Sequence, residues 1–421
     1  MDYFNHLQEK MFFVRSRRQA VPPAEGSYMT KRFQKYGIVC RLLGCLFIEG
    51  IWDSSLKKAR VRMISVYSLY SAACILLSLA LAALLVGKLF LASYITESFT
   101  KSLLFIVNSI VLTRITVNFG CMVWGSSDLL QFFRDSQNYE LSSSFKHIED
   151  SDILCTSWHA RLRKLASLAT WLATYGFIIR VPVVTLVQGD EEWWWLCVMA
   201  ANILSSFVMA LCDFIAYIVL SCCTDVLAGY LRAQITTLRR QESHMHPYLQ
   251  ARRRIETVRI HVSTIKRLKR SLNAIWYPAL AVWPVCIILI LCVTLYAITT
   301  GNIGHPDVWI SIAYSAQASI SFIDLAILSQ ALTDEAHKLK DATIRAGMSV
   351  NTKSCREQVQ YLHDTIDPES MCLSGAGFFR LNKALLLSMA GSIITYAVIL
   401  VQTGDELAEH VDVSSIMRKG A

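Results

Sequence analysis

The stretch "ALLLSMAGSIITYAVILVQ", Ala384–Gln402, runs for nineteen residues without a charged side chain. A helix of about 20 apolar residues is long enough to cross the hydrocarbon core of a bilayer. The stretch therefore predicts a membrane-spanning helix near the end of the chain. Its unusual feature is Gln402, because an amide within an apolar segment needs a hydrogen-bonding partner or water.

The rest of the chain has the same character. Of its 421 residues, 54% are hydrophobic and only 17% are charged, whereas soluble domains carry about 25% charged residues. Hydropathy predicts an all-α integral membrane protein with seven transmembrane helices, at about 61–86, 99–124, 165–187, 193–220, 274–299, 308–332 and 384–402. The shorter apolar run "YGIVCRLLGCLFIEGIW", residues 36–52, predicts an interfacial or buried helix before the first span.

Basic residues alternate between the two sides of the predicted spans. The first 60 residues contain eleven Lys and Arg, and the loop after the fourth span contains eleven more. The segments "QGDEE" after the third span and "GNIGHPD" after the fifth contain none. Because basic loops stay in the cytoplasm, the N-terminus is predicted to be cytoplasmic and the C-terminus extracellular.

The long cytoplasmic loops predict helical extensions that form an anchor layer. One of them carries apolar residues at helical spacing among its arginines. They are Ile255, Val258, Val262, Ile265 and Leu268. Such a stripe predicts helix packing, either within one subunit or between subunits.

These features divide the chain into five parts. They are a cytoplasmic N-terminal segment with a pre-span helix (1–60), a bundle of six spans with cytoplasmic helix extensions (61–332), a cytoplasmic linker and anchor helix (333–383), span seven (384–403) and an extracellular tail (404–421).

The last span carries one polar stripe. Residues three and four apart share a helix face, and here that face holds Ser388, Ser392, Thr395, Ile399 and Gln402. Several such helices around an axis would line a pore, with an apolar constriction beside a polar ring. An acidic outer mouth that favours cations would follow, formed by Asp405, Glu406 and Glu409. The alternative is that these Ser and Thr residues serve close helix packing and bond their own backbone.

The segment "GAGFFRLNKALLLSMAGSIITYAVILVQ", residues 375–402, resembles the C-terminal signature of the arthropod gustatory receptor family, which is related to the insect odorant receptors. The family pattern is Thr-Tyr, five hydrophobic residues, Gln and usually Phe. Thr395, Tyr396, "AVILV" and Gln402 match it, and Thr403 replaces the Phe. The resemblance covers about thirty residues.

This resemblance implies a ligand-gated, non-selective cation channel in the plasma membrane of sensory neurons, opened by a small tastant. It further implies a homo-tetramer, or a hetero-tetramer with related receptors, in which span seven of each subunit lines the pore. By motif position, Ile399 would be the hydrophobic gate, Gln402 the adjacent polar ring, and Tyr396 a packing residue against neighbouring helices.

The resemblance also implies a ligand pocket among the outer halves of spans two to six. Aromatic faces with a few amides suit a small polar or amphipathic ligand. Depth and chemistry select Asn108, Arg180, Trp195, Asn202, Tyr296, Trp309, Tyr314 and Gln317 as candidates. For Trp195 and Trp309, the aromatic belt at the membrane interface is the alternative.

Charges within the predicted spans need partners, because an unpaired charge in a bilayer is costly. Arg180 and Asp213 lie near mid-depth in adjacent spans and are predicted to pair, and Arg114 and Asp324 are predicted to form a second pair. Each pair would be either a structural ion pair or a ligand contact. Asp225 is predicted to be paired in the cytoplasmic extension.

Other functional classes have less support. The chain has no CxxC spacing, nucleophile constellation or phosphate loop, which argues against an enzyme and predicts no metal and no cofactor. Its basic charge is attributed to cytoplasmic loops rather than to nucleic-acid binding.

A G-protein-coupled receptor is the main alternative. The reversed orientation argues against it, as does the lack of Asp-Arg-Tyr and Asn-Pro-x-x-Tyr motifs at the expected places. A secondary transporter is a further alternative, weakened by the lack of an internal repeat.

Overall fold

A computed structural model of the chain describes residues 27–51, 56–62, 64–76, 80, 99–145, 162, 165–166, 168–172, 176, 193–242, 248–299, 306–348, 353–375 and 377–419. Its helices are α2 (Tyr28–Leu42), α4 (Phe99–Trp124), α5 (Ser126–Ser143), α7 (Trp193–Glu242), α8 (Tyr248–Thr299), α9 (Pro306–Met348), α10 (Lys353–Thr365), the 3-10 turn η2 (Pro368–Met371) and α11 (Lys383–Lys419). Two short antiparallel hairpins join them, β1 (Ile48–Glu49) with β2 (Arg60–Val61) and β3 (Ser374–Gly375) with β4 (Phe379–Arg380).

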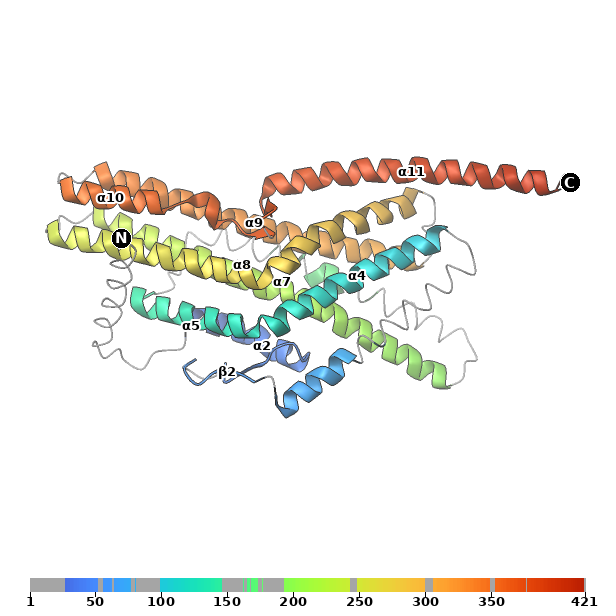
Figure 1. The fold of residues 1–421 in the computed structure, drawn as a ribbon, viewed down its shortest axis with the longest axis horizontal. Helices are drawn as coiled ribbons and strands as arrows, with labels where there is room; N and C mark the ends of the chain where they lie inside the picture. The colour runs from blue at the N-terminus through green and yellow to red at the C-terminus, as the bar shows by residue number, and fades with distance from the viewer. Residues whose placement is uncertain are drawn as a thin grey trace.

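The long helices α7, α8 and α9 pack against one another and form the centre of the molecule. At one end α5 and α10 join them, and at the other end the helices diverge (Figure 1). The helix α4 packs against α7 and α8. The close-packed end corresponds to the predicted cytoplasmic anchor layer, and the diverging end to the predicted membrane region.

Four of the described helical segments are long and apolar enough to cross a membrane. They are Ala216–Arg239, Arg252–Thr299, Ser311–Gly347 and Lys383–Gln402. Two shorter apolar helices, Val66–Leu76 and Ser109–Trp124, coincide with parts of predicted spans one and two. By length and composition, these helices are those of a helical membrane protein.

Several predicted boundaries agree with the helices. The helix α4 has the predicted bounds of span two, and α7 continues beyond the predicted span four to Glu242 as one helix. The stripe on α8, from Ile255 to Leu268, is buried within the single chain. Of the two alternatives for this stripe, the structure supports packing within one subunit.

The prediction for the region before span one is wrong in part. The helix α2 begins earlier, at Tyr28, and ends at Leu42, so the second half of the run 36–52 is a turn and a strand. Gly44 adopts φ +74°, a conformation that side-chain-bearing residues rarely adopt, and an added Cβ would lie 3.1 Å from Ser71 Cα. The predicted start of span one at Val61 is likewise a strand, paired with Ile48.

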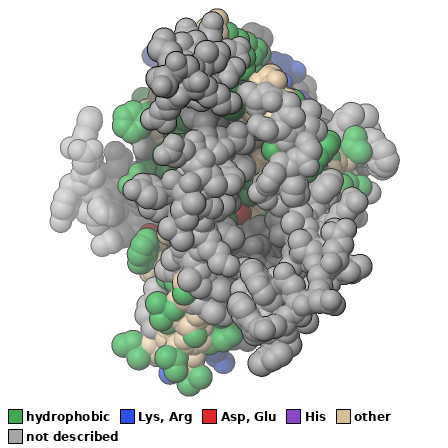
Figure 2. All heavy atoms as spheres, turned by 90° about the vertical axis from the view of Figure 1, so that its right-hand side faces the viewer, with side chains coloured by type: hydrophobic (Ala, Val, Ile, Leu, Met, Phe, Trp, Pro, Cys, Tyr) green, Lys and Arg blue, Asp and Glu red, His purple; other side chains and the backbone are tan. Residues whose placement is uncertain are grey.

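The last helix, α11 (Lys383–Lys419), is the least buried of the candidate spans. Within Lys383–Gln402, only 6% of the 18-residue apolar window is buried, against 50–72% for the corresponding windows of the other three candidate spans. The helix α11 runs along the edge of the bundle and continues to Lys419, through the predicted tail 404–421 (Figure 1). Seen from the end where α11 terminates, the described side chains are mainly hydrophobic (Figure 2). This apolar helix is thus left largely uncovered by its own subunit.

Candidate functional site

A cluster of polar and aromatic side chains lies buried between four helices of the bundle. Arg114 and Asn118 lie four residues apart on α4, and therefore on one face of it. Asp213 comes from α7, Trp283 from α8 and Tyr314 from α9. All five side chains are at most 8% exposed, so the cluster is almost completely removed from solvent.

An ion pair holds the centre of this cluster. Arg114 Nη2 lies 3.1 Å from Asp213 Oδ2, and the two side chains are 1% and 2% exposed. Asn118 Nδ2 donates a hydrogen bond to the other carboxylate oxygen, Oδ1. Trp283 Nε1 in turn donates to Asn118 Oδ1 at 2.7 Å. These contacts connect α4, α7 and α8.

The guanidinium of Arg114 also lies against two aromatic rings. Its Cζ is 5.3 Å from the ring centre of Trp283 and 5.9 Å from that of Tyr314. Such cation–π contacts strengthen when water is excluded. Arg114 Nε and Nη1 have no hydrogen-bond partner among the described residues. The cluster therefore offers two N–H donors beside aromatic faces, which is suitable for a ligand oxygen or a water molecule.

The polar stripe on α11 lies away from the face that packs on its own subunit. The side chains of α11 in contact with the core are Leu385, Leu386, Met389, Leu400 and Val401.

None of the stripe residues belongs to that packing face. Ser388, Thr395, Ile399 and Gln402 are exposed, and Ser392 is partly exposed. Ser392 Oγ donates to the Ser388 carbonyl at 3.1 Å and Thr395 Oγ1 to the Gly391 carbonyl at 3.0 Å, which is the backbone bonding foreseen as the alternative to a pore.

The model of the family described as 7tm Chemosensory receptor matches residues 36–406 of the chain. The chain belongs to this chemosensory receptor family. The fold agrees with two solved structures of the insect olfactory receptor OR5 from Machilis hrabei. One, in complex with eugenol, has a TM-score of 0.68 at 13% identity and covers 89% of this chain and 99% of that one. The other has a TM-score of 0.65 at 15% identity and covers 89% and 98%. A search of curated proteins found no match.

Of the ligand-pocket candidates whose side chains the structure describes, only Tyr314 joins the polar cluster. Tyr296 is buried in α8, and Gln317 Nε2 donates to Ser321 Oγ one turn along α9, at 3.4 Å. Trp309 is 44% exposed, which suits the aromatic belt. Arg180 lies outside the described residues, as do the side chains of Asn108, Trp195 and Asn202.

One predicted ion pair of the receptor was wrong in its partner. Arg114 pairs with Asp213 rather than with Asp324, because α4 packs on α7. Asp324 instead accepts a hydrogen bond from Tyr217, so this second buried acid links α7 to α9. The predicted contact of Asp213 with Arg180 lies outside the described residues.

Sequence reasoning missed Asn118 and Trp283. The available signal for Asn118 was its spacing of four from Arg114, which places two polar side chains on one face of an apolar helix. Trp283 carried no comparable signal, because a tryptophan in an apolar span is equally expected as packing. Its role follows from the packing of α8 on α4.

A second polar network joins α2, α5 and α7 in the receptor. As predicted, Asp225 is paired there, with Arg32 Nη1 at 2.7 Å. Glu140 accepts hydrogen bonds from the backbone N–H groups of Tyr28 (2.7 Å) and Met29 (3.0 Å), and from the Tyr230 hydroxyl. A carboxylate at the start of a helix satisfies N–H groups that have no partner within the helix. Glu140 thus anchors α2 onto α5 and α7.

The signature residues of span seven remain predictions. Tyr396 is 56% exposed in the single subunit, so more than half of its surface is left uncovered by this chain. Asp405, Glu406 and Glu409 lie within α11, but their side chains are outside the described set.

Proposed function

We propose that this chemosensory receptor is a gustatory receptor, a non-selective cation channel opened by a small tastant. In this proposal, four subunits place their seventh spans around a central pore, as a homo-tetramer or together with related receptors in the plasma membrane of sensory neurons. The observation that carries the proposal is the exposure of α11. Its apolar window is only 6% buried, and its polar stripe lies outside its packing face.

The stripe supplies the chemistry that a gated pore needs. Ile399 would form an apolar ring, which closes a narrow pore by excluding water. Gln402, one turn further out, would form a ring of amides that replaces part of the hydration of a passing cation. Asp405, Glu406 and Glu409 would then raise the local cation concentration at the outer mouth.

The tastant would bind within the bundle of spans two to six. The Arg114 cluster supports this, because it presents N–H donors beside two aromatic rings in a dry environment. One related structure contains eugenol, and a small aromatic molecule with an oxygen acceptor fits the same chemistry. Tyr314 is the residue shared by the predicted pocket and this cluster.

Expression of the receptor alone, with a panel of tastants and a calcium readout, tests the pore. Ile399→Ala should raise ligand-free calcium entry, because a smaller side chain widens the constriction. Gln402→Ala should change permeation, with surface expression kept in both. Ile394→Ala is the matched control, since this isoleucine is 65% exposed on the same helix but lies off the stripe. Unchanged responses in both stripe variants would reject the pore assignment.

The orientation is tested separately with an epitope tag at the C-terminus. Antibody should label the tag on intact, unpermeabilised cells. Labelling that requires permeabilisation would place the C-terminus in the cytosol and favour the G-protein-coupled alternative. Current that depends on a substrate gradient would favour a transporter.

A further inference from the structure

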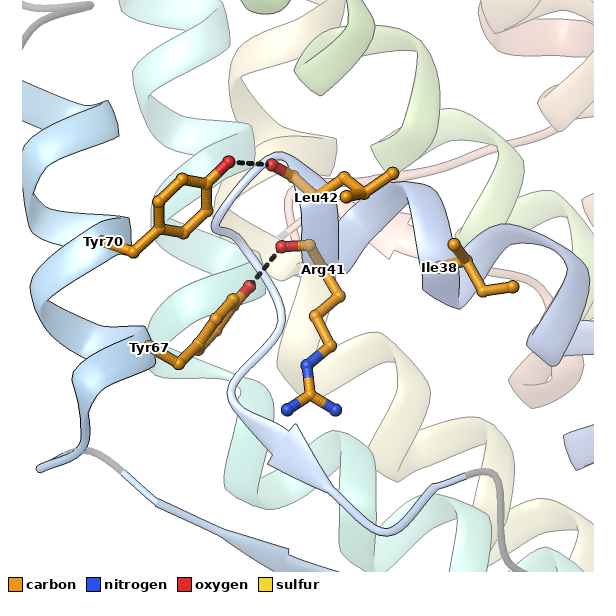
Figure 3. A pocket seen from close by; sticks show the side chains of 5 residues that line it. All are labelled: Ile38, Arg41, Leu42, Tyr67 and Tyr70. Carbon is orange, nitrogen blue, oxygen red and sulfur yellow. Dashed lines mark hydrogen bonds between the residues drawn. The ribbon is translucent and has the colours of Figure 1, made fainter.

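A groove opens between the C-terminal end of α2 and the helix Val66–Leu76. It has a volume of about 530 Å³ and is lined by Ile38, Arg41, Leu42, Tyr67 and Tyr70 (Figure 3). The volume lies within the range of about 300–1,000 Å³ that small-molecule sites occupy. The groove uses none of the residues of the polar cluster or of α11.

The polar groups of the backbone beside this groove are already satisfied. The Tyr67 hydroxyl donates to the Arg41 carbonyl at 2.7 Å, and the Tyr70 hydroxyl to the Leu42 carbonyl at 2.5 Å (Figure 3). These carbonyls belong to the last turn of α2, where the regular helical N–H partners end, and the Arg41 carbonyl also accepts from the Gly44 N–H at 3.1 Å. The remaining wall is apolar and open, with Ile38 56% and Leu42 66% exposed. An apolar occupant would cover this wall without displacing a hydrogen bond.

The same groove contains one cation. Arg41 Cζ lies 5.3 Å from the ring centre of Tyr67, and no carboxylate of the described residues lies within 4 Å of this guanidinium. The surrounding segment is strongly basic, since residues 27–70 contain eight Lys and Arg but only two Asp and Glu. The groove therefore complements an anion that also carries an apolar portion.

We propose that this groove binds one anionic phospholipid of the inner leaflet. The phosphate lies on the Arg41 guanidinium, whose planar donors suit phosphate oxygens, and an acyl chain covers Ile38 and Leu42. A soluble anion would leave the apolar wall in water. A zwitterionic lipid would bring a second cation to a basic segment. The assignment to the inner leaflet rests on the proposed function, in which the N-terminus is cytoplasmic and α2 therefore lies at the inner leaflet.

Native mass spectrometry of the purified full-length receptor tests this site. The receptor is equilibrated with equal amounts of phosphatidylserine and phosphatidylcholine, and the lipids retained per subunit are counted. The unmodified receptor should retain phosphatidylserine preferentially. Arg41→Ala should lower its apparent affinity about five-fold or more, as expected for one arginine at an anionic surface. Arg41→Lys should have an apparent affinity between those of the unmodified receptor and Arg41→Ala, because lysine keeps the charge but lacks the planar guanidinium.

Leu42→Asp tests the apolar wall and should also lower retention. The position is 66% exposed, so folding is not at risk there. Arg62→Ala is the control, since Arg62 is a half-exposed arginine of the same segment that lies 3.6 Å from Glu49. Equal retention of the two lipids, displacement by millimolar inorganic phosphate, or an equal loss in Arg62→Ala would overturn the proposal. Because retention is measured without any current, failure here leaves the channel proposal standing, and failure of the pore test leaves this one.

Discussion

Replacing Asp213 with asparagine should leave the Arg114 guanidinium as a buried charge without its countercharge. The amide oxygen of the new side chain can still accept the hydrogen bond from Asn118, so the change isolates the charge. Both members of the pair are at most 2% exposed. Breaking so deeply buried a pair costs about 3–5 kcal/mol. Arg114→Met should cost a similar amount, because it leaves the carboxylate with Asn118 alone.

The double variant, Arg114→Met with Asp213→Asn, removes both charges together. Replacement of a complete buried pair by neutral residues is often close to neutral, so we expect a loss of no more than about 2 kcal/mol. The assay is the melting temperature of the receptor in detergent, followed as loss of the monodisperse peak in size-exclusion chromatography. At roughly 1–2 °C per kcal/mol for a chain of this length, each single variant should melt about 3–10 °C lower.

The decisive quantity is the coupling between the two substitutions. The two single losses would sum to about 6–10 kcal/mol if they were independent. A double loss of no more than about 2 kcal/mol therefore means a deviation from additivity of about 4 kcal/mol or more, above the range of about 0.5–3 kcal/mol that contacting groups usually show, and the double variant should be more stable than either single variant. A double variant that loses the sum of the two single losses would refute the ion pair as the element that joins α4 to α7. Trp283→Phe serves as the control, because it removes the indole donor to Asn118 and part of the ring beside Arg114 but keeps both charges of the pair.

Three further predictions concern residues outside the Arg114 cluster. Glu140→Ala should cost about 3 kcal/mol or more, measured as a lower melting temperature, because it leaves buried donors at the start of α2 without an acceptor. Gly375→Ala should reduce folded yield on size-exclusion chromatography, because its Cβ would collide with the ring of Phe379 just before α11. Burial lowers the pKa of His261, so the folded receptor binds this proton more weakly than the unfolded chain. The associated stability is present above the ordinary histidine pKa of about 6.5 and is lost as the pH falls below it, and His261→Gln should flatten the decline in melting temperature between pH 7 and 5.

The sequence by itself determined the membrane class and most helices. Apolar runs of bilayer length need no tertiary information, since the hydrocarbon core forces each span to satisfy its own backbone hydrogen bonds. Span two, the long extension of span four and the polar stripe of span seven followed from periodicity and composition. The signature around Thr395 and Gln402 was sufficient for the family.

Only the tertiary structure decided which charges meet. Arg114 and Asp213 lie 99 positions apart, and the neighbour that each helix chooses depends on side-chain packing across the whole bundle. For the same reason Trp283 and Asn118 entered the cluster without a strong sequence signal. The turn at Gly44 was also invisible to hydropathy, because an apolar composition suits a buried strand and a helix equally well. Periodicity thus determines the face that a helix buries, whereas only the assembled packing determines which partner covers that face.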